Sequence, residues 1–86
     1  MTNAQIVSNG VTHILDVYDT PQTRAAWYEY LNWVRLNYQP HLKKLTIGQL
    51  VDMHLADLGL TRGATRASVY LYGSQEDLMA WMLSHA

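Results

Sequence analysis

The chain of 86 residues contains no cysteine, and charged residues make up only 15% of it. Without cysteine, neither a disulfide framework nor a cysteine-based zinc site can form, which is typical of a reducing compartment. No apolar run approaches the ~20 residues that span a bilayer, and no basic segment followed by an apolar run marks a signal peptide. The sequence therefore predicts a soluble, cytoplasmic protein without membrane contact, and its length predicts a single domain over residues 1–86.

The net charge is −1, which disfavours a protein that coats nucleic acid through an overall positive charge. Positive charge nevertheless gathers in the middle of the chain, in residues 41–66, whereas the segments before and after it are net negative. Such a local excess can act as a small electrostatic footprint for DNA phosphates. Its basic side chains are Lys43, Lys44, Arg62 and Arg66.

Apolar residues make up 49% of the chain, including three Trp and six Tyr. A chain this short buries a limited fraction of its surface, so we expect some apolar surface to face a partner. The simplest partner is a second copy, which predicts a homodimer. Large apolar anchors dominate protein interfaces, and the candidates for partner binding are Tyr28, Trp33, Leu36 and Trp81.

Capping residues predict three helices. Thr20 followed by Pro21 is typical of a helix start, and this helix should run to about residue 37, before the proline at 40. Thr46 and Gln49 have the spacing of a capping box for a second helix that stops at a glycine, residue 59. Ser74 is the expected cap of the last helix.

Two segments are ambiguous. In residues 5–15, apolar residues at helical spacing favour a helix, but the Asn-Gly pair at 9–10 is a hairpin signal. In residues 61–72, Thr61 or Thr65 as a cap favours a short helix, but the β-branched and aromatic content of 67–72 suits a strand. Taking helix in both, we expect an all-α bundle of four or five helices with a helix-turn-helix-like pair. The alternative is an α+β fold with an N-terminal hairpin and a strand at 67–72.

No phosphate-binding loop or nucleophile motif occurs. His13 with Asp16, and His54 with Asp57, each have a spacing of three and could share a helix face. A catalytic zinc site usually has three protein ligands, however, so neither pair is sufficient. We therefore expect no enzyme, no metal site and no cofactor.

The order of a helix, a tight turn and a second segment with hydroxyls and arginines is typical of a helix-turn-helix. Lysines and hydroxyls suit phosphate oxygens, and Arg62 or Arg66 could read guanine in a major groove. The predicted nucleic-acid-binding residues are Lys43, Lys44, Thr61, Arg62, Thr65, Arg66, Ser68 and Tyr70.

Four short motifs carry a resemblance to a known family. They are Leu-Thr-Ile at 45–47, Gly-Leu-Thr-Arg-Gly at 59–63, Tyr-Leu-Tyr at 70–72 and Ser-Gln-Glu-Asp-Leu at 74–78. In this order they resemble the DNA-binding module of TetR-type regulators over residues 45–83. The resemblance implies a recognition helix with Thr61, Arg62 and Tyr70 near phosphates, although this chain has additional residues between Gly63 and Tyr70.

Two hypotheses of function follow. The first is a small helix-turn-helix protein that binds duplex DNA, such as a compact transcriptional regulator of a bacterial or mobile genetic element. The second is a protein-interaction module, a small adaptor or inhibitor that binds a protein partner through an aromatic surface.

Overall fold

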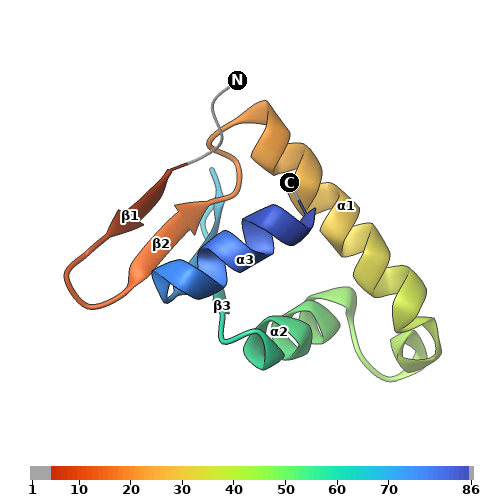
Figure 1. Ribbon diagram of the computed structural model, residues 1–86. Coiled ribbons are helices and arrows are strands. Elements are labelled where there is room, and N and C mark those ends of the chain that lie inside the picture. Colours follow the sequence, from red (N-terminus) through yellow and green to blue (C-terminus); the bar gives the residue numbers. More distant parts are fainter. Residues whose placement is uncertain (1–4, 86) are drawn as a thin grey trace.

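The structure, a computed structural model, describes residues 5–85, with all of their side chains except those of 41, 42 and 85. Two strands, two helices, two further strands and a last helix follow one another along the chain (Figure 1). The elements are β1 (Ile6–Ser8), β2 (His13–Asp16), α1 (Pro21–Asn37), a 3-10 helix (Gln39–Lys43), α2 (Ile47–Asp57), β3 (Thr61–Ala64), β4 (Val69–Gly73) and α3 (Gln75–His85).

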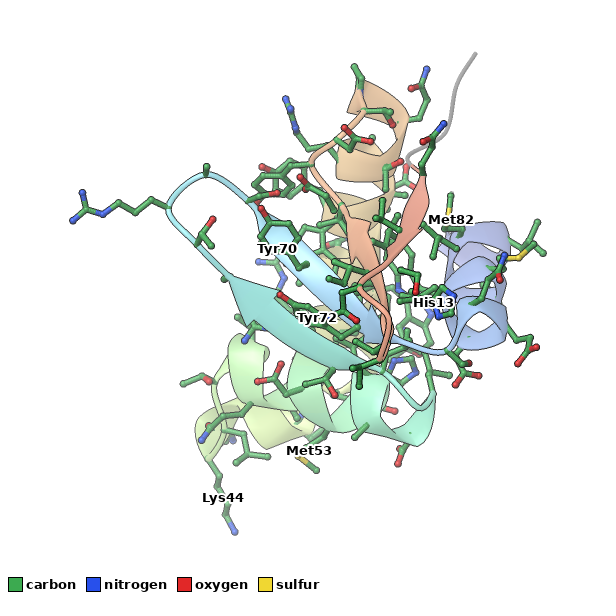
Figure 2. All side chains as sticks on the ribbon, turned by 90° about the vertical axis from the view of Figure 1, so that its left-hand side faces the viewer. His13, Lys44, Met53, Tyr70, Tyr72 and Met82 are labelled. Carbon is green, nitrogen blue, oxygen red and sulfur yellow. The ribbon has the colours of Figure 1, made fainter. Side chains whose placement is uncertain are left out.

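The four strands form one antiparallel sheet in the order β1-β2-β4-β3. The helix pair α1–α2 is thus inserted between β2 and the β3–β4 hairpin, whose second strand returns to pair with β2. In Figure 2 the sheet faces the viewer and the helices lie behind it and at its margins. One face of the sheet, the inner face, is therefore covered, and the other, the outer face, is open.

The core lies between the inner face and the helices. Leu15 of β2 and Leu71 of β4 are cross-strand partners, and both are fully buried. From the helices, Tyr30, Val34 and Trp81 are buried to 98% or more, and the ring centroids of Tyr30 and Trp81 lie 5.7 Å apart. Each such side chain stabilises the fold by about 1.5–3 kcal/mol relative to an exposed one.

The prediction of an all-α bundle is wrong, because this is an α+β fold with three α-helices and a four-stranded sheet. Residues 6–16 form the β1–β2 hairpin instead of a helix. The turn is closed by Asn9, whose side-chain oxygen accepts hydrogen bonds from the backbone N–H groups of Val11 and Thr12. Gly10 adopts a positive φ of 90° in this turn, a conformation that glycine reaches without strain.

The predicted short helix from Thr61 or Thr65 is also wrong, because residues 61–73 form the β3–β4 hairpin. The Thr65 hydroxyl stabilises its turn by accepting hydrogen bonds from the backbone N–H groups of Ala67 and Ser68. A strand at 67–72 has no evident partner in the sequence, but β4 pairs with β2 on one side and β3 on the other. The α+β alternative is the one that the structure confirms.

The three helices predicted from caps are confirmed. Thr20 Oγ1 accepts a hydrogen bond from Thr23 N–H at the start of α1. At the start of α2, Thr46 and Gln49 form a complete capping box, with both side chain–backbone hydrogen bonds present. Ser74 Oγ accepts from the backbone of the first turn of α3. No helix within residues 5–85 is long and apolar enough to cross a membrane.

Candidate functional site

The N-terminal end of α2 is exposed and carries positive charge. Residues 38–46 connect α1 to α2, a longer turn than the three or four residues usual in a helix-turn-helix. Lys43 and Lys44 lie in the second half of this connector, and both side chains are exposed. They precede the Thr46 cap, so their charges adjoin the positive end of the α2 dipole.

The β3–β4 hairpin is fixed to α2 at its base. The backbone N–H of Leu60 donates to the Leu55 carbonyl, so the chain turns directly from the helix into β3. Arg62 of β3 then donates two hydrogen bonds to the Asp52 carboxylate of α2, at 2.8 and 3.2 Å. The hydrogen bond to Asp52 raises the pKa of Arg62. A Cβ added to Gly48 would lie 3.3 Å from Arg62 Nη2, so the guanidinium packs closely on the first turn of α2.

The turn of this hairpin projects from the body of the protein. Residues 64–67 are all exposed, and Arg66 lies at the tip. In Figure 2 this turn lies at the upper left, and Lys44 lies at the lower left. We call Lys43, Lys44 and Arg66 the basic set; none of the three forms an ion pair with any residue that the structure describes.

Acidic side chains occupy the opposite end of α2. Asp57 is its last residue, and Glu76 and Asp77 stand in the first turn of α3. The two helix ends are close, because a Cβ added to Gly59 would lie 2.5 Å from Asp77 Oδ2. In Figure 2 α3 lies on the right, away from Lys44 and the hairpin turn. The protein is therefore electrically asymmetric although its net charge is only −1.

The other predicted nucleic-acid-binding residues lie elsewhere or have structural partners. Arg62 is held by Asp52, and Ser68 is 95% buried and donates a hydrogen bond to Asp16. Thr61 and Tyr70 share the outer face of the sheet with Tyr72, and the Thr65 hydroxyl closes the hairpin turn. Among the positively charged residues predicted to bind nucleic acid, the basic set is therefore exposed, whereas Arg62 is paired.

The predicted partner-binding residues do not form one patch. Trp81 is a core residue, only 2% exposed. Tyr28 and Trp33 of α1 are both exposed, but they line different hollows of the surface. Tyr28 lines a hollow together with Ile47, and Trp33 lines another together with Trp81. Leu36 is exposed on the same helix.

The outer face of the sheet is a surface that the sequence did not predict. Cross-strand pairing aligns Val7, Ile14, Tyr72 and Thr61 in one row across all four strands. Tyr70 lies beside this row, with its ring centroid 6.3 Å from that of Tyr72 (Figure 2). The Tyr-x-Tyr alternation at 70–72 was the available signal, since side chains two apart in a strand point to the same face.

Comparison of the chain with protein-family models, with curated proteins and with solved structures finds no match. Within the described residues, no group of three or more His, Asp and Glu side chains is placed to hold a metal ion.

Proposed function

We propose that the protein binds duplex DNA, with the N-terminal end of α2 and the turn of the β3–β4 hairpin against the phosphate backbone. The observation that carries the proposal is the basic set, which combines two lysines at a capped helix start with an arginine on the hairpin that follows the same helix. The free backbone N–H groups and the positive dipole end of a helix N-terminus suit phosphate oxygens.

The charge asymmetry supports this orientation. Phosphates are attracted to Lys43 and Lys44 and to the positive end of the α2 dipole, and repelled from the end that carries Asp57 and Asp77. The Arg62–Asp52 ion pair holds the hairpin against α2, so the two contact elements keep a constant spacing. Arg62 serves here as a positioning residue rather than as a reader of bases.

Salt dependence tests the proposal. Three phosphate contacts give a slope of about −2.7 in a plot of log affinity against log salt concentration, so a fourfold rise in salt lowers the affinity about 40-fold. Fluorescence anisotropy of a labelled duplex at about 50 mM and about 200 mM salt measures this slope. The absence of saturable binding at the lower salt concentration would refute the proposal.

Charge-conserving variants supply the control. Replacing both lysines by alanine (Lys43→Ala, Lys44→Ala) should reduce the slope by about 1.8, because two contacts are lost. Replacing both by arginine should leave the slope unchanged. An equal reduction of the slope in both double variants would mean that the lysines support the fold and do not contact phosphates.

A second candidate function is self-association through the outer face. The outer row presents Val7, Ile14 and Tyr72 without a covering helix, and Val7 is 59% exposed. The Asp16 carboxylate on this face accepts hydrogen bonds from the Ser68 hydroxyl and Tyr18 N–H, so it has internal partners. A second copy offers the same neutral, apolar row in return, as a two-fold interface requires.

Sedimentation equilibrium over a range of protein concentrations tests self-association. Val7→Glu should convert a dimer to a monomer, because it places a charge in the row that the two copies share. Val11→Glu is the matched control, since Val11 is 95% exposed in the β1–β2 turn and lies outside the row. A wild-type monomer at all concentrations would exclude this second candidate.

A further inference from the structure

We propose that the groove between α1, α2 and α3 binds a small organic cation of the alkylammonium type. The groove has a volume of about 360 Å³, within the range of small-molecule sites. Trp33 of α1 and His54 of α2 form one wall, and α3 supplies Asp77, Ala80, Trp81 and Ser84. This groove takes no part in the proposed contact with DNA.

The indole ring of Trp33 makes the groove attractive to a cation. Trp33 is held in place by its neighbours, with its ring centroid 5.0 Å from that of His54 and 6.4 Å from that of Tyr30, on which it stacks. It nevertheless remains 40% exposed, so indole surface is left for a ligand. The faces of indole rings are electron-rich and attract ammonium groups, most strongly where water is partly excluded.

The Asp77 carboxylate supplies the complementary charge. Asp77 lines the groove and is half-buried against Gly59. Its carboxylate neither forms an ion pair with, nor accepts a hydrogen bond from, any side chain that the structure describes. Asp57 and Glu76 are its acidic neighbours at this end of the molecule. A bound cation would therefore meet negative charge on one side and aromatic carbon on the other.

Small residues leave space for the ligand. Asp77, Ala80, Trp81 and Ser84 recur at the spacing of one face of α3, and Ala80 and Ser84 extend little beyond the helix backbone. The mostly aromatic and aliphatic lining favours a cation that carries alkyl groups over a strongly hydrated metal ion. This combination of one carboxylate with aromatic and aliphatic walls defines the class of ligand.

Choline and neohexanol, its uncharged isostere, are the probes for this site. In two-dimensional NMR of the ¹⁵N-labelled protein, choline should shift the indole N–H signals of Trp33 and Trp81 in a saturable manner. The signal of Trp27, which does not line the groove, should stay in place and serves as an internal control. Neohexanol should bind about tenfold more weakly, because it lacks the charge. Equal binding of the two probes, or no saturable shift with choline, would overturn the proposal.

Two matched pairs of variants test which residues contact the bound choline. Asp77→Asn should weaken choline binding about tenfold, whereas Glu76→Gln, in the same helical turn but outside the groove lining, should change it less than about twofold. Trp33→Leu should abolish the saturable shift, whereas Tyr28→Leu, an exposed aromatic that borders another hollow of α1, should not. If the control variants weaken binding as much as their counterparts, the groove is not the site.

Discussion

The two faces of the sheet are built from alternate residues of the same strands, but they are buried to very different extents. On the inner face Leu15 and Leu71 are fully buried beneath the helices. On the outer face Ile14, Tyr70 and Tyr72 are only half-buried, and Val7 is 59% exposed. Apolar side chains occur on both faces, so the position of the helices decides which of them are buried.

The outer face obtains its order from contacts within the sheet. A Cβ added to Gly63 would lie 2.8 Å from Tyr72 Cε2, so the Tyr72 ring packs directly against the glycine of the neighbouring strand. The inner face instead relies on close packing with side chains from the helices. Substitutions on the two faces should therefore change the free energy of unfolding by different amounts. On the inner face they should disturb packing with the helices, and on the outer face packing within the sheet.

The largest effect is expected from Leu71→Ala on the inner face. Removing this fully buried side chain leaves a cavity and should lower the free energy of unfolding by about 2–5 kcal/mol. Tyr70→Ala, one residue away on the outer face, should have less than half of that effect, because solvent already reaches its ring. Urea unfolding followed by circular dichroism measures both; equal losses would remove the distinction between the faces.

Gly63→Ala should have the next largest effect, about 1–3 kcal/mol, because the added methyl group displaces the Tyr72 ring. The same substitution in a Tyr72→Ala background should change stability by less than about 0.5 kcal/mol, since no ring remains to be displaced. A double-mutant cycle of urea unfolding curves gives the coupling energy. Additive effects would show that the glycine is required for another reason.

A smaller effect, dependent on pH, is expected at Tyr30 behind the inner face. Its hydroxyl lies 2.6 Å from His54 Nδ1, and burial raises the pKa of Tyr30 above the ordinary value of 10.0. The neutral phenol is favoured in the folded state, so its contribution to stability is complete below about pH 10 and is lost as the pH rises further.

Tyr30→Phe should therefore reduce stability by about 1 kcal/mol at neutral pH. It should also make the loss of stability at alkaline pH smaller. Thermal unfolding of the wild type and the variant between about pH 8 and about pH 11 makes this comparison. An unchanged pH profile in the variant would assign the alkaline loss to other groups.

The smallest effect is expected at the β3 edge, where the Arg62–Asp52 ion pair is partly exposed. Asp52→Asn should lower the free energy of unfolding by less than about 1 kcal/mol, and added salt should reduce the difference. Asp57→Asn, on the same helix and without an ion-pair partner among the described residues, is the control. A loss at position 52 that is insensitive to salt would point to packing and not to charge.

The sequence by itself determined the three helices. Each start depends on a hydroxyl side chain that accepts from a backbone N–H three residues later, as at Thr20, Thr46 and Ser74. The end of α2 depends on Gly59, which adopts a positive φ of 79°. These interactions are local, so the residue types and their spacing are enough to predict them.

The candidate site was predictable only in part. Lys43, Lys44 and Arg66 could be named as exposed cations from the sequence, whereas the ion pair of Arg62 with Asp52 could not, because the two residues belong to different elements. The burial of Ser68 depends on a hydrogen bond to Asp16, 52 positions earlier. Such contacts become visible only when the elements are packed.

Only the tertiary structure decided between helix and strand in residues 5–15 and 61–72. Both segments contain side chains compatible with either state, and β4 becomes a strand because β2 and β3 flank it. Its pairing with β2 places Leu71 opposite Leu15, although the helices α1 and α2 lie between these two residues in the sequence. A strand obtains its backbone hydrogen bonds from distant segments, whereas a helix obtains them from its own neighbours, and this is why the helices could be predicted from the sequence and the sheet could not.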